Sequence, residues 1–345
     1  MINQFKNKGV SRRQALLLGG SAAAVVAAPY IVRPARAADF VFRIAHSEAI
    51  GSPMTLAFEA WTNTLNEKSN GAIEAQHFPA GQLGSYTQLI ESSRLGTTEA
   101  TAGGPDTEEA VAPEIAATGG APGFIYKNEA HVDAVLQGPI GDSVSEIARE
   151  KTGVEFVAYG EVGFRHLLAN RAVSDMAGLA GLKIRVPELK VWVDFWKALG
   201  SNPTPLPYAE QYNALSTGVI DGLEGDFFSI LGFKWFEQAA NLTLTYHWFL
   251  PKAIRVNAAW LDSLPEDLRE LVRSTAKEAF AAQRASNRAN TAKALEDLKG
   301  QGVAVQELAA DEKANWVAAA EPLFEEFGKK SEATAKMIAD IRGLG

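Results

Sequence analysis

Hydrophobic and polar positions predict strands followed by helices along the first part of the chain. Residues 40–45 alternate large apolar residues with other residues, as a half-buried strand does. Residues 53–68 then repeat apolar side chains at helical spacing, and residues 72–78 and 83–95 predict a second strand and a second helix. This strand–helix–strand–helix order predicts an α/β fold with parallel strands.

Another strand is predicted from residue 154, and a second α/β unit is predicted to begin at residues 184–186. Strand character is found in residues 154–158 and 184–186, a short strand or loop is expected over 201–207, and helices over 192–199 and 208–217. Residues 265–298 contain no glycine, and their single proline stands at the start, which predicts a helix of roughly 50 Å. Because such a helix is longer than one small domain, it is a natural connector between two lobes.

Two arginines stand out against this apolar pattern. Arg185 lies between β-branched residues and is followed closely by Pro187, in a segment expected to be at least half buried. A buried unpaired charge is costly, so Arg185 must find an anion, and its planar fork suits a carboxylate. The alternative is a structural salt bridge to an acidic residue of this chain. Arg165 is predicted at the end of another strand, and two arginines facing one cleft would clamp a carboxylate.

Four further side chains are candidate ligand contacts. Ligands of open α/β sheets bind at the carboxyl ends of strands, where His46 follows the first predicted strand. His46 would either donate to a ligand hydroxyl or cap the next helix, and Tyr208 would either stack on a ligand or pack internally. Asp226 could accept from ligand hydroxyls or an amine, and Phe227 could line a pocket; for both, the alternative is an ordinary loop residue.

Patterns that indicate catalysis or metal binding are missing from the sequence. It has no cysteine, no phosphate-binding loop, no dinucleotide fingerprint and no Gly-x-Ser-x-Gly motif. The histidines show no His-x-x-x-His spacing, and Glu74 and His77 fall on a predicted strand, where residues three apart point to opposite faces. The sequence therefore favours a binding protein, with no cofactor and no metal, over an enzyme.

Residues 1–37 are predicted to be an export signal. Paired arginines at Arg12 and Arg13 precede a mildly apolar stretch, and residues 35–37 form a small-x-small cleavage site, as in a twin-arginine (Tat) signal. The alternative is an uncleaved membrane anchor, which prolines and arginines near residue 30 disfavour.

The net charge of the mature chain agrees with export to the periplasm. Six of the 33 basic residues and none of the 41 acidic residues lie in residues 1–37, which leaves a mature net charge of −14. So acidic a surface argues against nucleic-acid binding. We therefore expect a mature protein that is soluble in the periplasm.

Several longer motifs resemble those of the extracytoplasmic solute receptors of TRAP transporters, the DctP type. The resemblance covers nearly all of the mature chain. The matching segments are Phe78-Pro-Ala-Gly-Gln-Leu-Gly84, Leu179-Ala-Gly-Leu-Lys-Ile-Arg185-Val186, residues 202–222, residues 235–237 and residues 244–247.

The resemblance implies a two-lobed periplasmic binding protein fold (type II-like), with a long helix spanning both lobes. Lobe I would comprise residues 38–163 plus about 248–285, and lobe II residues 164–247 plus about 286–345. Arg185 would form the principal salt bridge to a ligand carboxylate, with Arg165 and Tyr208 as further ligand contacts. The lobes would close on a small organic acid.

The implied partners are the small and large membrane subunits of a TRAP transporter, to which the protein, expected to be a monomer, would deliver its ligand. Two other classes stay open at this point. One is a periplasmic Tat-exported enzyme, and the other is a receptor that passes its ligand state to a membrane signalling protein.

One departure from the family pattern concerns the ligand. Where the family commonly has a ligand-contacting Asn after Asp-Gly-x-Glu, this chain has Gly225, followed by Asp226. The carboxylate clamp is thus expected to be intact and the far end of the pocket altered. We expect a hydroxylated monocarboxylate such as a sugar acid. The alternatives are an aromatic or branched hydroxy acid and a C4-dicarboxylate.

Overall fold

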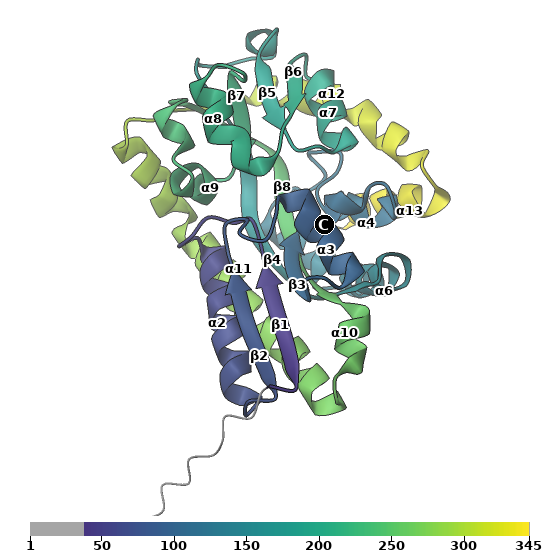
Figure 1. Ribbon diagram of the computed structural model, residues 1–345. Helices are drawn as coiled ribbons and strands as arrows, with labels where there is room; N and C mark the ends of the chain where they lie inside the picture. The colour runs from purple at the N-terminus through teal and green to yellow at the C-terminus, as the bar shows by residue number, and fades with distance from the viewer. Residues whose placement is uncertain (1–37, 345) are drawn as a thin grey trace, which may run out of the picture. The chain divides into compact units, whose positions relative to one another are not determined.

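The structure of the protein is a computed structural model that describes residues 38–344 (Figure 1). The predicted export signal, residues 1–37, lies outside the described residues. Within the described part of the chain, every helix is too short or too polar to cross a membrane.

A mixed β-sheet organises the described residues (Figure 1). Its strands follow the order β2-β1-β3-β8-β4-β7-β5-β6, and β9 pairs with β8. The strands are β1 (Phe40–Ala45), β2 (Ile73–Phe78), β3 (Ala100–Gly103), β4 (Val154–Ala169), β5 (Lys183–Val186), β6 (Asn202–Pro205), β7 (Gly222–Gly225), β8 (Asn241–Asn257) and β9 (Ala304–Glu307). The predicted parallel pairing is confirmed at both ends of the sheet, where β1 pairs with β2 and β3, and β5 with β6 and β7.

The centre of the sheet differs from the prediction, because two long antiparallel strands join its two ends. β4 is far longer than the predicted segment 154–158, and β8 was not predicted. Along β8 only Tyr246 is exposed, and its first residue, Asn241, is partly exposed. A strand buried on both faces shows no alternation of polar and apolar residues, so its sequence carries no clear strand signal.

The pairing of β4 with β8 is irregular midway along both strands. Its register shifts between Glu161 and Gly163 and again between Arg165 and Leu167. At the first shift, the side chain of Gln283 accepts from the Glu161 amide at 3.0 Å and donates to the Glu161 carbonyl at 2.8 Å. Since bulges bend strands and interrupt ladders, the pairing of the two central strands is locally weakened here.

The first helices begin where local capping chemistry allows. α2 (Pro53–Lys68) starts after Ser52, whose hydroxyl accepts from a backbone amide of the first turn, and it confirms the prediction. α3 (Tyr86–Leu95) begins later than residue 83, because Gly84 has a φ of 145° and Ser85 forms a capping box with Gln88.

The predicted long helix is confirmed as α11 (Glu266–Gly300). Its first half contributes Val272 and Phe280 to the core beneath β1 and α2. Its last turns contribute Ala294 and Leu298 to a separate core that includes Trp235 and residues of β7 and the start of β8. One helix thus packs into both cores, while the lobe boundaries given above remain a prediction.

The remaining helices are shorter and surround the sheet (Figure 1). The predicted helix 208–217 is divided into a 3-10 turn and α8, and a further 3-10 turn covers Pro105–Glu108. The helices are α4 (Pro113–Ala117), α5 (Glu129–Leu136), α6 (Pro139–Thr152), α7 (Lys190–Ala198), α8 (Gln211–Ser216), α9 (Phe227–Gly232), α10 (Ala258–Ser263), α12 (Ala310–Gly328) and α13 (Glu332–Gly343).

Candidate ligand-binding site

A small polar cavity lies where segments following β1, β3, β5 and β7 meet the middle of β4 and β8. Its volume is about 40 Å³, enough for a few water molecules. Charged and aromatic side chains dominate its lining, which consists of Ser47, Glu48, Tyr86, Asp106, Val162, Arg165, Arg185, Pro187, Trp192, Tyr208, Glu224, Asp226, Ser229, Leu250 and Lys252.

Arg185 is a buried cation with no carboxylate partner among residues 38–344. It is 3% exposed on β5, and its Nε and Nη2 both donate to the Leu206 carbonyl, at 3.0 and 2.8 Å. Its guanidinium lies 5.5 Å from the centre of the Tyr208 ring. Burial lowers the pKa of Arg185 to about 10, with only partial compensation from the more distant Glu224. The cavity therefore has a cationic group whose charge the protein leaves unpaired.

Arg165 has a different environment, because the protein already supplies its anion. It lies within β4 rather than at a strand end, which corrects the prediction. Its Nη2 donates to Glu224 Oε1 and to the Glu224 carbonyl, both at 2.9 Å, and its Nε contacts Glu224 Oε2. Asp226 Oδ2 lies 3.6 Å from Nη1. Burial opposes the charge of Arg165, but Glu224 and then Asp226 raise its pKa above the ordinary value.

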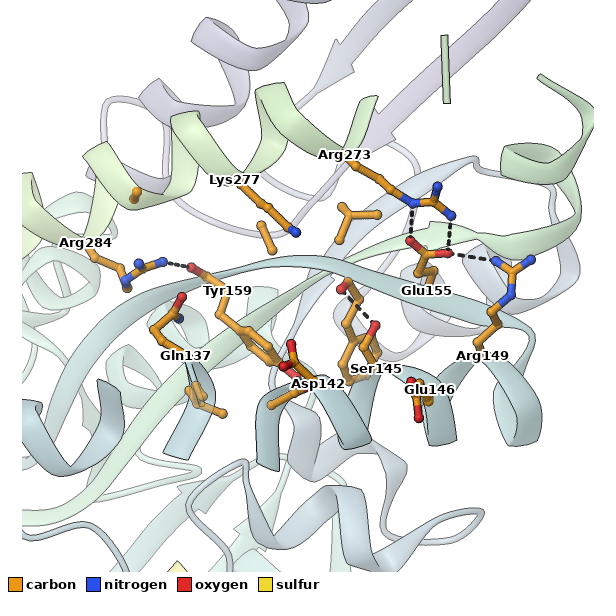
Figure 2. A pocket seen from close by; sticks show the side chains of 16 residues that line it. Gln137, Asp142, Ser145, Glu146, Arg149, Glu155, Tyr159, Arg273, Lys277 and Arg284 are labelled. Carbon is orange, nitrogen blue, oxygen red and sulfur yellow. Dashed lines mark hydrogen bonds and ion pairs between the residues drawn. The ribbon is translucent and has the colours of Figure 1, made fainter. Parts of the chain in front are cut away.

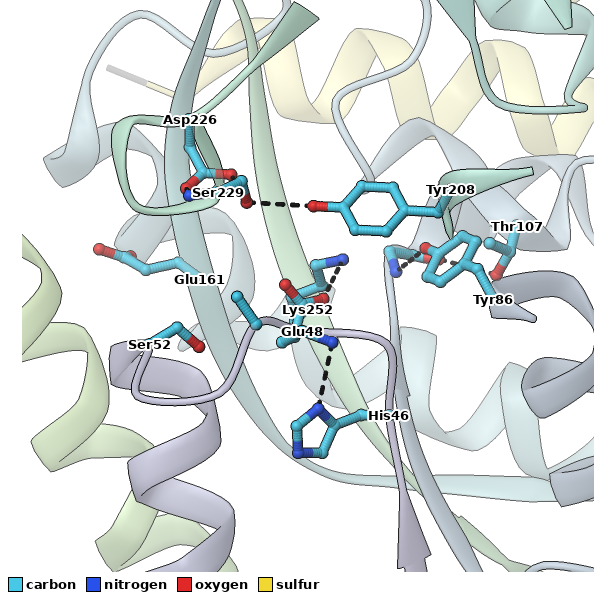
Figure 3. A network of polar contacts seen from close by, with 12 residues as sticks. His46, Glu48, Ser52, Tyr86, Thr107, Glu161, Tyr208, Asp226, Ser229 and Lys252 are labelled. Carbon is cyan, nitrogen blue, oxygen red and sulfur yellow. Dashed lines mark hydrogen bonds and ion pairs between the residues drawn. The ribbon is translucent and has the colours of Figure 1, made fainter. Parts of the chain in front are cut away.

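A second internal ion pair crosses the floor of the cavity (Figure 3). Lys252 Nζ lies 2.8 Å from Glu48 Oε1, and both residues are buried. Burial disfavours the charge of Lys252, but Glu48 and Tyr86 raise its pKa above the ordinary value. Neither residue was predicted, although a lysine inside the apolar run that forms β8 was a signal that could have found it.

Asp226 and Tyr208 meet through one serine, as Figure 3 shows. Asp226 caps α9 by accepting from the Ser229 amide at 2.9 Å and from its hydroxyl at 2.6 Å. The Ser229 hydroxyl lies 3.2 Å from that of Tyr208. Burial raises the pKa of Asp226, while Arg165 opposes this shift.

The substitution at Gly225 does not remove a contact from this cavity. A Cβ atom added to Gly225 would lie 3.0 Å from the Trp235 ring, in the core behind β7. Successive residues of a strand point to opposite faces, so Glu224 and Asp226 face the cavity and position 225 faces away. On this backbone a side chain at position 225 would point into the core, and the expected change at the far end of the pocket stays a prediction.

The structure does not bring the last two predicted residues into the lining. His46 is fully buried, with its Nε2 at 2.7 Å from His77 Nε2 and its Nδ1 accepting from the Glu48 amide at 3.2 Å (Figure 3). Phe227 stacks on His166, with ring centres 4.6 Å apart. His46 thus supports the segment that carries Glu48, and four of the six predicted residues line the cavity.

Asp106 and Trp192 also line the cavity and bond to each other. Trp192 donates from its Nε1 to Asp106 Oδ2 at 2.7 Å. Burial raises the pKa of Asp106 to about 6, although Trp192 and nearby cations oppose the shift. Asp106 was missed, although it follows the unusual Gly103-Gly104 pair directly after a strand.

A wider groove of about 800 Å³ lies between α6, the start of β4 and α11 (Figure 2). Its one network of ion pairs among the described lining residues is at Glu155, which accepts from Arg273 at 2.7 and 2.9 Å and from Arg149 at 2.7 Å. Arg284 donates to the Tyr159 carbonyl at 2.5 Å. Because the groove has no buried unpaired charge like that of Arg185, we place the ligand site in the smaller cavity.

Comparison with known proteins agrees with this geometry. Residues 44–331 match the sequence profile of DctP, the bacterial extracellular solute-binding protein family 7. The chain belongs to this family. The family consists of binding proteins rather than enzymes, as the sequence predicted.

Individual relatives cover most of the chain. A solute-binding protein of Verminephrobacter eiseniae is 31% identical over 295 residues, which are 85% of this chain and 87% of the relative. The 2,3-diketo-L-gulonate-binding periplasmic protein YiaO of Escherichia coli is 30% identical over 72% of this chain and 76% of its own.

A crystal structure supports the same fold. The TRAP periplasmic solute-binding protein of Xanthobacter autotrophicus, solved with bound β-D-galacturonate, superposes with a TM-score of 0.82 at 30% identity. The alignment covers 88% of this chain and all of that one. The predicted family and two-lobed fold class of this DctP-family chain are confirmed.

Proposed function

We propose that this protein is the solute-binding subunit of a TRAP transporter and that it captures a sugar acid through Arg185. The observation that carries the proposal is the unpaired charge of Arg185 inside a polar cavity. A ligand carboxylate would provide the missing anion, and a guanidinium can bind both carboxylate oxygens in parallel. No reaction is performed on the ligand.

The other charges of the cavity favour a monocarboxylate over a dicarboxylate. Arg165 and Lys252 are already paired with Glu224 and Glu48, so a second ligand carboxylate would meet no free cation. Carboxylates and hydroxyls such as those of Asp226 and Ser229 are instead suited to ligand hydroxyl groups. The bound galacturonate of the Xanthobacter protein and the name of the Escherichia coli relative support a sugar acid.

Binding requires the cavity to open and close. A volume of about 40 Å³ holds a few waters but not a sugar acid, so the described conformation has to open before a ligand enters. The irregular pairing near Glu161 and Gly163 provides a place for the lobes to rotate, and α11 would bend with them. A ligand that contacts both lobes would then shift the equilibrium toward the closed form.

The location and partners follow from the same proposal. Residues 1–37 would direct Tat export to the periplasm, where the mature protein would act as a monomer. There the closed form would dock on the small and large membrane subunits of the transporter. Delivery, rather than signalling to a membrane receptor, is supported by the TRAP relative of known structure.

A thermal-shift screen of organic acids tests the proposed function, followed by calorimetry on the acids that stabilise the protein. We expect sugar monocarboxylates to bind one to one, without product formation, and to raise the melting temperature. Stabilisation by C4-dicarboxylates or unhydroxylated acids alone would refute the sugar-acid assignment. Turnover of a bound acid would refute the binding-protein assignment.

A further inference from the structure

One buried carboxylate oxygen in the cavity wall has no hydrogen-bond partner in the described part of the chain. Asp106 is 2% exposed, and its Oδ2 accepts from Trp192 while its Oδ1 accepts from nothing. Buried polar atoms are nearly always paired, and leaving a charged one unpaired is costly. An unpartnered oxygen in a cavity lining therefore points to a donor that arrives with the ligand.

A neighbouring hydroxyl group complements this oxygen. Tyr86 lines the same cavity, and its hydroxyl oxygen accepts from the Gly104 amide at 2.7 Å. That bond uses the oxygen as acceptor and leaves the phenolic proton available to donate. Gly104 is two residues before Asp106. The Asp106 carboxylate and the Tyr86 hydroxyl, which is bonded to Gly104, therefore both lie at the turn that follows β3.

We propose that Asp106 and Tyr86 recognise one specific hydroxyl group of the ligand, Asp106 accepting its proton and Tyr86 donating to its oxygen. This assignment rests on the proposed function, because Arg185 holds the carboxylate that fixes where the hydroxyl lies. Arg185 belongs to β5, whereas Asp106 and Tyr86 come from the β3 side of the sheet. A sugar acid held at both places would bridge the two lobes.

A hydroxyl group fits the unpartnered oxygen because it can donate its proton to Asp106 and accept from Tyr86 at the same time. The cations that attract Asp106 are themselves paired, Lys252 with Glu48, Arg255 with Glu108 and Arg165 with Glu224. The geometry thus makes Asp106 a residue that selects for hydroxylated acids against deoxy acids.

The test compares Asp106→Asn with the wild type by calorimetry. The ligands are D-galacturonate, D-galactonate and a series of their monodeoxy analogues, each lacking one hydroxyl. We expect the substitution to weaken the parent acid by about 10- to 100-fold. For one deoxy analogue only, the wild type and the variant should bind equally, because the interaction is already missing.

The matched control is Glu109→Gln. Glu109 belongs to the same segment and accepts from the Val191 amide at 3.0 Å, but it does not line the cavity, so its substitution should leave the affinities unchanged. Should Asp106→Asn fail to fold, Tyr86→Phe provides the same comparison and should couple to the same ligand hydroxyl.

Two outcomes would overturn the assignment. One is an Asp106→Asn variant that binds the parent acid as tightly as the wild type, and the other is an equal loss for the parent and every deoxy analogue. Both leave the proposed function intact, since the wild type still binds sugar acids. If the wild type binds no hydroxylated acid at all, the proposed function and this inference fall together.

Discussion

Arg165 and Arg185 line one cavity, are buried to nearly the same extent and yet have opposite surroundings. Arg165 is 4% exposed and is neutralised by Glu224, whereas Arg185 is 3% exposed and faces a carbonyl oxygen and a tyrosine ring. The first arginine contributes to the stability of the folded chain. The second is the arginine that we propose for the ligand, so burial alone would not distinguish the two roles.

The largest expected effect is on the stability provided by the Arg165 pair. Glu224→Ala leaves the buried guanidinium of Arg165 with only the more distant Asp226, so the free energy of unfolding should fall by about 3–5 kcal/mol. Chemical denaturation of the ligand-free protein measures this change. Asp194→Ala is the control, because it breaks the exposed pair with Lys190 and should cost less than about 1 kcal/mol. Equal stabilities for both variants would mean that Arg165 does not depend on Glu224.

Arg185→Ala should show the reverse pattern. Removing the unpaired charge should weaken binding of the true ligand by about 2–5 kcal/mol. The free energy of unfolding should stay the same or rise, because a desolvated cation without a carboxylate is removed. Calorimetry and denaturation on the same preparation separate the two effects. Arg185→Lys should bind with intermediate affinity, since lysine keeps the charge but lacks the planar fork. Near wild-type affinity for Arg185→Ala would show that the carboxylate binds elsewhere.

The smallest expected effect concerns the pH dependence of stability due to Asp106. It tests whether Arg165, which is paired with Glu224, also stabilises the charged form of Asp106. Burial raises the pKa of Asp106 from its ordinary 3.8 to about 6, so Arg165 and its neighbours do not compensate fully. Between these values the native state binds more protons than the unfolded state, and stability therefore falls as the pH rises. The expected loss is about 1 kcal/mol between about pH 5 and about pH 6.

Asp106→Asn should lack this component, because asparagine does not titrate. The measurement is the difference in unfolding free energy between the wild type and this variant across the same pH range, which cancels the titration of other groups. Parallel curves for the two proteins would mean that Asp106 is ionised throughout and that the cations of the cavity do support it.

Local sequence patterns identified the outer parts of the fold better than its centre. α2 and β1 were predicted with their observed bounds, because amphipathic spacing and a capping serine are local signals. β8 was missed, because a strand buried along nearly its whole length loses the alternation that marks strands. The 3-10 turn at Tyr208 also escaped prediction, because its geometry depends on packing against Phe233 and Trp235.

The site shows the same limit. The burial of Arg185 could be predicted from one short segment, because a charged residue among β-branched apolar residues is expected to be buried with them whatever the rest of the fold. The pairing of Arg165 with Glu224 could not, because it depends on β4 lying beside β7. Asp106 could not be predicted either. It stands out only in the folded structure, where its Oδ1 has no hydrogen-bond partner among residues 38–344.

The central pair of strands also has a consequence for how the chain acquires its structure. β8 supplies the partner for β3 and for nearly all of β4, and the paired residues of β4 and β8 are separated by about 70 to 100 residues. During synthesis, β3 lacks its β8 partner until residue 256 has been made, and the part of β4 beside β7 lacks its β8 partner until residues 241–250 have been made. Folding is therefore expected to be slow and cooperative, with both lobes forming together. A chain cut between β5 and β8 would yield two fragments that each lack a central strand.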